Sequence, residues 1–332
     1  MSDGGEGVLV AIPCLNEAAH LPALLAQLIA GTPRATIVVA DGGSTDGSVA
    51  IVAALARNHA RLNLIDNPAR LQAAGINRVV RLHARGHDWL VRIDAHCDYP
   101  VGYVAGLVAA ARRTGAQSVV VPMVSRGRSG FQIAAAAAQN SRLGTGGSPH
   151  RHVGVGRFVD HGHHALMALE LFRRVGGYDE AMATNEDAEL DHRIALAGGR
   201  IWLEPGLALT YYPRASPAAL WRQYWRYGRG RAQTVRRHGL RLKVRQMLPL
   251  LVPAAAGMAL LAPLWWPLIL PFAFWAAACL LGGAWIGARS RSLPALLSGP
   301  AAMIMHLAWG GGFLWEWLAR SGTSAAPAAI RS

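Results

Sequence analysis

The sequence predicts an α/β domain built on a mostly parallel sheet, followed by a helical transmembrane region. From residue 8 to about residue 210, short apolar segments alternate with longer segments whose apolar residues recur every three or four positions. These patterns are typical of buried strands and amphipathic helices. From residue 247 to residue 288, by contrast, 42 consecutive residues contain no Asp, Glu, Lys or Arg. That run is long enough for two membrane-spanning helices of about 20 residues each.

Predicted strands and helices alternate through the first part of the chain. The strands are expected at 8–12, 36–40, 62–65, 89–93 and 118–122. The helices are expected at 21–29, closed by Gly31, and at 48–57, 71–84 and 101–112. Helices of this length between strands favour right-handed βαβ units, and therefore a parallel sheet flanked by helices. Ligands of such sheets bind beyond the carboxyl ends of the strands.

The uncharged C-terminal run divides at 265–267, where two tryptophans precede a proline, because indoles favour the membrane interface and proline breaks helices. We expect spans at about 247–264 and 268–287, and a third at about 294–317. The alternative is a buried helical core domain, although soluble helices normally carry a charged face. The predicted domains are the α/β domain (8–221), a basic juxtamembrane helix (222–245), the transmembrane region (246–318) and a disordered tail (319–332).

The positive charge of the chain is concentrated in the predicted juxtamembrane helix. The net charge is +14, and residues 222–245 contain nine basic and no acidic side chains, whereas residues 1–221 carry a net charge of only +2. A nucleic-acid binder would carry its charge across a folded face, so this distribution argues against nucleic acid as a partner and leaves an arginine-rich nucleic-acid binder as a third alternative. The positive-inside rule places the basic stretch and the α/β domain on the cytoplasmic side of a multi-pass membrane protein.

Cysteine usage and the N-terminus agree with a cytoplasmic domain. Cys14, Cys97 and Cys279 lie far apart, which excludes a disulfide scaffold and a cysteine-only zinc site and fits a reducing compartment. The acidic start, MSDGGEG, and the short first apolar run are unlike a secretory signal.

Polar side chains follow the first, second and fourth predicted strands. They are Pro13, Asn16 and Glu17, then Asp41, Ser44 and Asp46 of the segment DGGSTDGS, then Asp94, His96 and Asp98. Carboxylates from three loops at one edge of a sheet would repel one another unless a divalent cation, or a base and ribose hydroxyls, were bound there. The alternative for DGGSTDGS is a glycine turn in which Asp46 only caps the next helix.

These motifs resemble the signature of glycosyltransferase family 2, whose catalytic domain has the GT-A nucleotide-sugar-binding fold. The motifs are IPCLNE (12–17), DGGSTDGS (41–48), DAH (94–96), GGYDE (176–180), NEDAEL (185–190) and RQYWRYG (222–228). Within the family, DAHCDYP, VDHGHH and RQYWRYGRGR, followed by a hydrophobic tail, are most similar to the ExoA-type succinoglycan glucosyltransferases. Those enzymes act on sugars carried by a polyprenyl diphosphate lipid.

The resemblance implies a site for a UDP-sugar donor and a divalent metal. The residues implied at the nucleotide and donor sugar are Pro13, Asn16, Glu17, Asp41, Ser44, Asp46, Gly75, Asn77 and Asp94. Asp94 and His96, a DxH in place of the usual aspartate pair, are implied as ligands of Mn²⁺ or Mg²⁺. The metal would neutralise the leaving nucleoside diphosphate. Asp98 either supports this pair or caps the helix that begins at Val101.

Asp187, in the acidic pair with Glu186, matches the general base of the family. Inversion at the anomeric carbon needs a carboxylate that removes the proton of the attacking acceptor hydroxyl. The alternative is structural: Thr184 or Asn185 caps a helix, and the carboxylates of its first turn only complement the helix dipole.

Two further groups are expected on the acceptor side. Gln223, Arg226 and Tyr227 match a QxxRW-like element with tyrosine in place of tryptophan, in which the guanidinium pairs with a diphosphate and the ring stacks on a sugar. His163 and His164, from the histidine-rich segment 150–164, are expected to meet the lipid diphosphate. A zinc site is the alternative for this segment, but its HGHH spacing fits no common structural zinc pattern.

Taken together, the resemblance implies an inverting hexosyltransferase anchored in the bacterial inner membrane and facing the cytoplasm. It would transfer glucose from a UDP-sugar to a polyprenyl-diphosphate-linked saccharide in exopolysaccharide biosynthesis, alongside other assembly enzymes. One alternative is a polyprenyl-phosphate sugar synthase, which keeps the fold and changes the acceptor. The alternative from another class is a non-catalytic, nucleotide-binding membrane scaffold.

Overall fold

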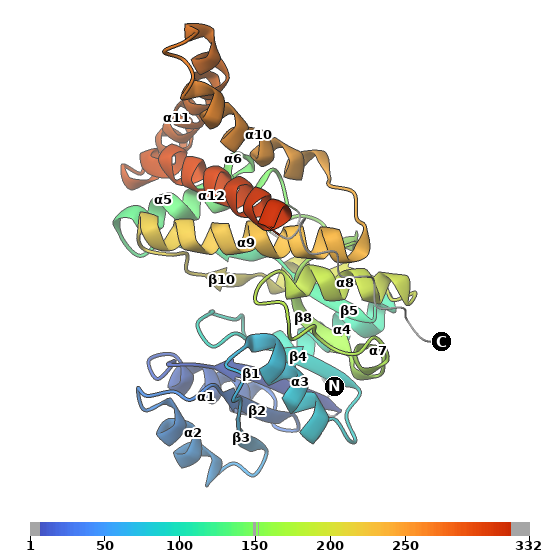
Figure 1. The fold of residues 1–332 in the computed structure, drawn as a ribbon. Helices are drawn as coiled ribbons and strands as arrows, with labels where there is room; N and C mark the ends of the chain where they lie inside the picture. Colours follow the sequence, from blue (N-terminus) through green and yellow to red (C-terminus); the bar gives the residue numbers. More distant parts are fainter. Residues whose placement is uncertain (1–6, 149–150, 152, 320–332) are drawn as a thin grey trace. The chain divides into compact units, whose positions relative to one another are not determined.

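The structure of the protein is a computed structural model that describes residues 7–148, 151 and 153–319. The chain forms two compact units (Figure 1). The first unit contains the residues up to 124 and residues 149–211, and the second contains 125–148 and the chain from 212 onward. The predicted tail, 319–332, lies outside the described residues apart from Ala319.

The first unit is built on an eight-stranded sheet in the order β3-β2-β1-β4-β8-β5-β9-β7. The strands from β3 to β4 are parallel, as is the pair β5 and β9, whereas β8 is antiparallel to both β4 and β5 and β7 is antiparallel to β9. The strands are β1 Val8–Cys14, β2 Thr36–Asp41, β3 Leu62–Asp66, β4 Trp89–Arg92, β5 Ser118–Val121, β7 Arg157–Val159, β8 His163–Ala168 and β9 Ile201–Leu203. The mostly parallel sheet confirms the predicted fold class. A separate two-stranded sheet contains β6 Met123–Ser125 and β10 Leu209–Tyr211.

Alternate residues of β1 pack into two different hydrophobic cores. Val8, Val10 and Ile12 share one core with α1, α2 and α4, whereas Leu9 and Ala11 share the other with α3, α7 and α8. This period of two is what a strand buried on both faces produces, so helices cover both faces of the sheet. The helices of this unit are α1 Leu21–Gly31, α2 Ser48–Ala56, α3 Gln72–His83, α4 Tyr103–Thr114, α7 Leu169–Arg174, α8 Glu186–Leu196 and the short 3₁₀ helix η2 Pro205–Leu207.

The second unit is helical. Its elements are α5 Gly130–Gln139, α6 Arg142–Thr145, α9 Pro217–His238, α10 Val244–Ala259, η3 Trp266–Ile269, α11 Leu270–Ser290, η4 Pro294–Leu297 and α12 Ser298–Ala319. Side chains of α5, α9 and α12 form its main core. Glycines let the backbones of α9 and α12 touch: a Cβ added to Gly228 would lie 2.0 Å from the Trp309 carbonyl oxygen, and one added to Gly312 would lie 2.2 Å from that of Trp225.

The structure corrects the number of expected membrane spans. Among the described residues, Trp266–Ser290 is the one helical segment long and apolar enough to cross a membrane, and only 11% of its most apolar window is buried. The 16-residue α10 is about 24 Å long, shorter than a hydrocarbon core of about 30 Å. Much of α12 is buried, and it contains the buried carboxylate of Glu316. The three predicted spans therefore reduce to one candidate.

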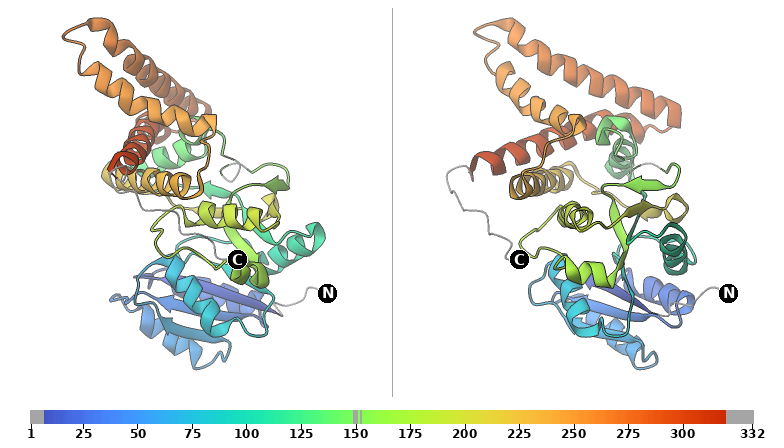
Figure 2. Two further views of the ribbon diagram at one scale, coloured as in Figure 1. Left: turned by 45° about the vertical axis from the view of Figure 1, so that its right-hand side comes forward. Right: turned by 90° about the vertical axis from the view of Figure 1, so that its right-hand side faces the viewer.

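The turn between α10 and α11 carries exposed apolar side chains. Within the second unit, this turn points away from α9 in all three views (Figures 1 and 2). Leu264, Trp265 and Trp266 at the turn are all well exposed. Tryptophan at such a position is typical of a membrane interface.

Candidate active site

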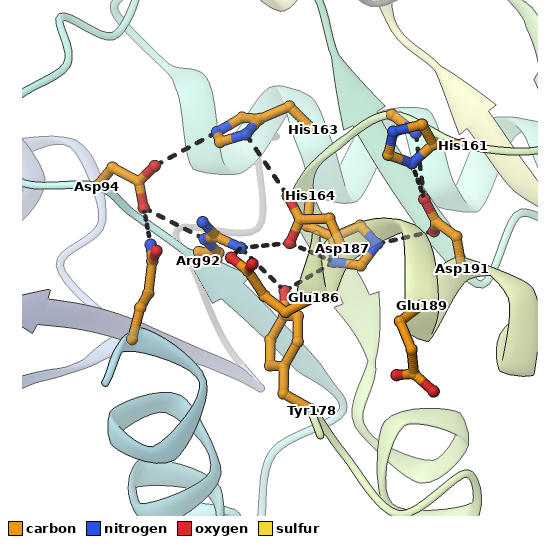
Figure 3. A network of polar contacts seen from close by, with 12 residues as sticks. Arg92, Asp94, His161, His163, His164, Tyr178, Glu186, Asp187, Glu189 and Asp191 are labelled. Atoms are coloured by element: carbon orange, nitrogen blue, oxygen red, sulfur yellow. Dashed lines mark hydrogen bonds and ion pairs between the residues drawn. The ribbon is translucent and has the colours of Figure 1, made fainter. Parts of the chain in front are cut away.

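The candidate site lies at the carboxyl end of β4, where the register of β8 brings distant residues together. β8 runs antiparallel to β4 with Val91 opposite Leu166. Continuing this register places the start of β8, at His163, beside the residues that follow β4. Asp94 and His163 consequently lie close together, and the first turn of α8 supplies Asp187 (Figure 3).

Arg92 is the centre of a buried ionic network (Figure 3). Its Nε donates to Asp94 Oδ1 over 3.2 Å, and its Nη1 donates to Asp187 Oδ1. The same Nη1 lies 3.6 Å from Glu186 Oε1 and 3.3 Å from the hydroxyl of Tyr178. One guanidinium therefore faces three carboxylates.

The two acidic residues at the start of α8 have opposite electrostatics. Burial raises the pKa of Glu186, and the neighbouring charge of Asp187 raises it further. Burial acts in the same direction on Asp187, but Arg92 and His164 outweigh it and hold the pKa of Asp187 well below its usual range. Asp187 therefore loses its proton at a lower pH than Glu186 does. Its position in the first turn of α8 also agrees with the structural reading, because both carboxylates lie near the helix N-terminus.

The histidine-rich segment holds α8 through Asp191, one turn after Asp187. Asp191 is fully buried and lies 3.0 Å from His161 Nδ1 and 2.7 Å from His164 Nε2. His164 Nδ1 lies 2.7 Å from the Tyr178 hydroxyl. Because His164 is 1% exposed and both of its ring nitrogens have protein partners, the structure gives it a role inside the protein. The expectation that His164 meets the acceptor diphosphate stays a prediction.

His163 occupies a different position from its neighbours in this segment. Its Nε2 lies 3.6 Å from Asp94 Oδ2 and its Nδ1 lies 3.7 Å from Asp187 Oδ2 (Figure 3). Burial lowers the pKa of His163 to about 4, although Asp94 acts in the opposite direction. The imidazole between the two carboxylates is therefore neutral at pH 7.

The loops expected to contact the nucleotide are held by their own hydrogen bonds. Asp41 Oδ2 accepts from the backbone N–H groups of Gly43 and Ser44, and the Ser44 hydroxyl donates to Asp41 Oδ1 over 2.5 Å. Asp46 Oδ1 accepts from the backbone and hydroxyl of Ser48, at the start of α2. Asp46 Oδ2 accepts from the backbone N–H of Ala18, so Asp46 joins the start of α2 to the loop after β1.

The loop after β1 packs against these residues. Pro13 lies near the end of β1, opposite Ala40 of β2. Asn16 Oδ1 accepts from the backbone N–H of Thr45, and the backbone of Asn16 adopts a positive φ of 58°. Glu17 Oε1 lies 2.9 Å from His96 Nδ1. The structure therefore pairs His96 with Glu17.

Two residues of α3 have structural contacts. Gly75 packs so closely that a Cβ would lie 2.8 Å from the side-chain nitrogen of Asn67. Asn77 is buried; its Nδ2 donates to the Tyr178 carbonyl oxygen and to Glu180 Oε1, and its Oδ1 accepts from the Tyr178 backbone N–H. Asn77 therefore holds the turn that places Tyr178 in the network.

The expected acceptor element lies on α9 of the second unit. Gln223 Nε2 donates to the Tyr227 hydroxyl over 3.1 Å, and Tyr227 packs against the core of that unit. Arg226 lies on the same helix.

The sequence analysis did not identify four residues of this network: Arg92, Tyr178, Asp191 and Gln72. Gln72 belongs to it because its Nε2 donates to Asp94 Oδ1 over 2.5 Å. Arg92 had a detectable signal, because a charge inside an otherwise apolar strand must find buried partners.

Among residues 7–148, 151 and 153–319, no group of three or more His, Cys, Asp or Glu side chains forms a metal site.

Comparisons with known proteins place the fold and its site in context. Residues 9–176 match the family model described as Glycosyl transferase family 2. The chain is 50% identical over 312 residues to "Succinoglycan biosynthesis protein ExoA" of Rhizobium meliloti (strain 1021), covering 93% of this chain and 94% of that protein. A solved structure, the mannosyltransferase PcManGT from Pyrobaculum calidifontis in complex with GDP-Man and Mn²⁺, has a TM-score of 0.62 at 22% identity and covers 95% of this chain and 90% of that chain. That likeness shows the GT-A fold alone.

The match to the family model spans about half of the chain, and the half-identical relative spans nearly all of it. These findings confirm the resemblance drawn from the motifs: the chain belongs to glycosyltransferase family 2.

Proposed function

We propose that the protein is a membrane-anchored, inverting glycosyltransferase that transfers glucose from a UDP-sugar to a polyprenyl-diphosphate-linked saccharide in exopolysaccharide biosynthesis. The name of its half-identical relative, a succinoglycan biosynthesis protein, supports the pathway. The catalytic unit faces the cytoplasm of a bacterium.

One observation carries this proposal: Arg92 joins Asp94 and Asp187 in a single buried network. Asp94 follows β4 in the motif implied at the donor diphosphate, and Asp187 is the residue implied as the general base. Both carboxylates bind Arg92 through Oδ1, and the Oδ2 atom of each faces His163. The donor side and the base side of a displacement thus meet in one place.

In the proposed reaction, the acceptor hydroxyl attacks the anomeric carbon of the donor as the bond from that carbon to the diphosphate oxygen breaks. The hydroxyl proton moves to Asp187 Oδ2, and the diphosphate oxygen leaves with the bonding electrons. Arg92 and His164 lower the pKa of Asp187 despite its burial, so the base is ionised before it accepts the proton. A positioned general base of this kind contributes about 10²- to 10⁴-fold to the rate.

A divalent ion, Mn²⁺ or Mg²⁺, fits the donor side of this network. Asp94 Oδ1 accepts from Gln72 and Arg92, whereas Oδ2 points toward His163. Carboxylate oxygens are suitable ligands for these ions, which are commonly held by one or two carboxylates and the substrate phosphates. When bound, the ion would neutralise charge on the leaving diphosphate.

The second unit supplies the proposed membrane contact. Trp266–Ser290 is the candidate anchor, and α9 carries a basic surface suited to anionic headgroups. A lipid-linked acceptor presents its sugar at the membrane surface, so an anchored enzyme meets its substrate there. Gln223, Arg226 and Tyr227 on α9 are proposed acceptor contacts.

The test is nucleoside diphosphate release by the detergent-solubilised protein. Wild type, Asp187→Asn and the surface control Glu170→Gln are compared with a panel of UDP-sugars and GDP-mannose, with and without Mn²⁺ or Mg²⁺ and with a lipid-linked acceptor. We expect metal-dependent release from UDP-glucose that is lost in Asp187→Asn and retained in Glu170→Gln.

Other outcomes contradict parts of the proposal. Equal release by wild type and Asp187→Asn would leave Asp187 as only a helix-start carboxylate. Release from a different donor would replace glucose. No release from any donor, even with lipid-linked acceptors, would favour the nucleotide-binding scaffold.

A further inference from the structure

His163 differs from the other histidines of its segment in the distances to its acidic neighbours. It is largely buried, and its ring nitrogens lie 3.6 Å from Asp94 Oδ2 and 3.7 Å from Asp187 Oδ2. Both distances exceed the roughly 2.7–3.2 Å of an N–H···O hydrogen bond. His161 and His164, from the same segment, lie within 3.0 Å of Asp191. The segment therefore contains two histidines that bind protein groups and one that faces two carboxylates at a longer distance.

Asp94 is oriented so that one oxygen faces this imidazole. Its Oδ1 accepts from Gln72 Nε2 and Arg92 Nε, and its backbone N–H donates to the Tyr99 hydroxyl over 2.7 Å. These bonds fix the carboxylate with Oδ2 directed at His163 Nε2 (Figure 3). An oxygen and a nitrogen thus converge from two elements, the loop after β4 and the start of β8.

We propose that Asp94 Oδ2 and His163 Nε2 are the protein ligands of the divalent ion, in place of the Asp94 and His96 pair predicted from the sequence. This inference rests on the proposed function, which requires the ion. Two ligands that each lie about 2.0–2.1 Å from one ion are at most about 4 Å apart, so a separation of 3.6 Å fits a shared ion. Carboxylate oxygen together with imidazole nitrogen suits Mn²⁺.

The second ring nitrogen of His163, Nδ1, fits the same assignment. A metal-bound histidine usually donates its second N–H to a carboxylate, which fixes the tautomer and the orientation of the ring. His163 Nδ1 faces Asp187 Oδ2, so Asp187 is placed to act as that carboxylate. The ion and the base then share one imidazole, which links donor binding to the orientation of the base.

His96 is in a different environment. Its Nδ1 lies 2.9 Å from Glu17 Oε1, and its side chain is 48% exposed. The acidic partner holds the ring on the loop after β1, so we assign His96 to that loop.

The test is electron paramagnetic resonance of Mn²⁺ bound to the full-length protein in detergent, with UDP present. An imidazole bound directly to Mn²⁺ produces ¹⁴N coupling in electron spin-echo experiments, and titration with Mn²⁺ measures the Kd. Wild type is compared with His163→Ala, His163→Gln and the matched control His96→Gln. Circular dichroism and thermal melting check that each variant folds.

We expect ¹⁴N coupling in wild type and in His96→Gln, and none in either His163 variant. The Kd for Mn²⁺ should rise at least about tenfold in His163→Ala. It should rise less in His163→Gln, whose amide oxygen can replace the nitrogen. If His163→Ala fails to fold, the ¹⁴N signal of His163→Gln decides the question alone.

Three results would overturn the assignment: no ¹⁴N coupling in wild type, coupling that persists in His163→Gln, or coupling that disappears in His96→Gln. Failure of the proposed function looks different. Mn²⁺ bound through His163 without sugar transfer would contradict the function and leave the ligand assignment intact, whereas metal-dependent transfer without His163 coupling would contradict only the ligand assignment.

Discussion

The two units of the molecule each contain a buried charged cluster, and the two clusters are balanced differently. In the first unit, Arg92 faces the carboxylates of Asp94, Glu186 and Asp187. In the second unit, Glu316 is 2% exposed; its Oε2 accepts from Arg229 Nε and its Oε1 from Gln233 Nε2, both over 2.8 Å.

The difference in the number of partners distinguishes the Arg92 cluster, a candidate binding site, from the Glu316 cluster, a structural contact. Glu316 on α12 has a donor for each oxygen, and both donors come from α9, so the cluster joins two helices without surplus charge. Removing ions from water is costly unless they are paired. Three carboxylates that face one guanidinium are therefore suited to a cationic ligand, and this is the arrangement in the first unit.

The largest expected effect comes from removing the negative charge proposed to act as the base. Asp187→Asn should lower kcat by about 10²- to 10⁴-fold, because an amide cannot take up the proton of the attacking hydroxyl. Its Tm should also fall, because the pKa of Asp187 lies well below its usual range in the folded protein, so the ionised carboxylate stabilises the fold. Nucleoside diphosphate release and thermal melting measure the two effects, with Glu170→Gln as the control. An unchanged Tm would show that the ion pair of Asp187 with Arg92 does not stabilise the fold.

Removing the positive charge should have the larger consequence for stability. Arg92→Met leaves the buried carboxylates without their cation, so we expect a destabilisation of about 3–5 kcal/mol. The control is Arg113→Met, which breaks an exposed ion pair with Glu204 and should cost about 0–1 kcal/mol. Denaturant unfolding monitored by fluorescence compares them. Equal losses in the two variants would mean that the Arg92 network is no more than a surface-like ion pair.

In the second unit, the balanced cluster should respond more mildly. Glu316→Gln keeps the shape of the side chain but removes its charge, so the bond from the partly exposed Arg229 weakens. We expect a destabilisation of about 1–2 kcal/mol, in the range of one hydrogen bond to a charged group. The Tm in detergent, with Glu170→Gln as the reference, measures this. A loss as large as that of Arg92→Met would remove the distinction between the clusters.

The smallest expected effect concerns a neutral histidine in the second unit. Burial lowers the pKa of His306 below its usual value, although its contact with the Leu143 carbonyl oxygen opposes this. A histidine that is harder to protonate when folded contributes stability above its unfolded pKa of about 6.5 and loses it as the pH falls from there toward the folded pKa.

The Tm of wild type should therefore fall more between pH 7.5 and pH 5 than the Tm of His306→Gln, and melting curves across that range measure the difference. Parallel curves for the two proteins would show that His306 does not titrate between the folded and unfolded states.

Local patterns were sufficient for much of the fold. All five predicted strands occur, because continuous apolar runs between helical repeats report burial on both faces of a sheet. The antiparallel β8 was not predicted, because it begins with two histidines and pairs with β4 and β5 through tertiary packing. The spans were overcounted because uncharged composition does not distinguish α12, which packs on α9, from a helix that lies in lipid.

The sequence by itself determined the α/β class, the family, and the placement of Asp41, Asp94 and Asp187 at a strand end, in a loop and at a helix start. Those features depend on short-range period and spacing. Only the tertiary structure decided that Arg92 joins Asp94 to Asp187, that His164 is buried against Asp191, and that His163 lies beside Asp94. Each of these contacts depends on the register of β8 against β4 and on the docking of α8, and long-range packing sets both.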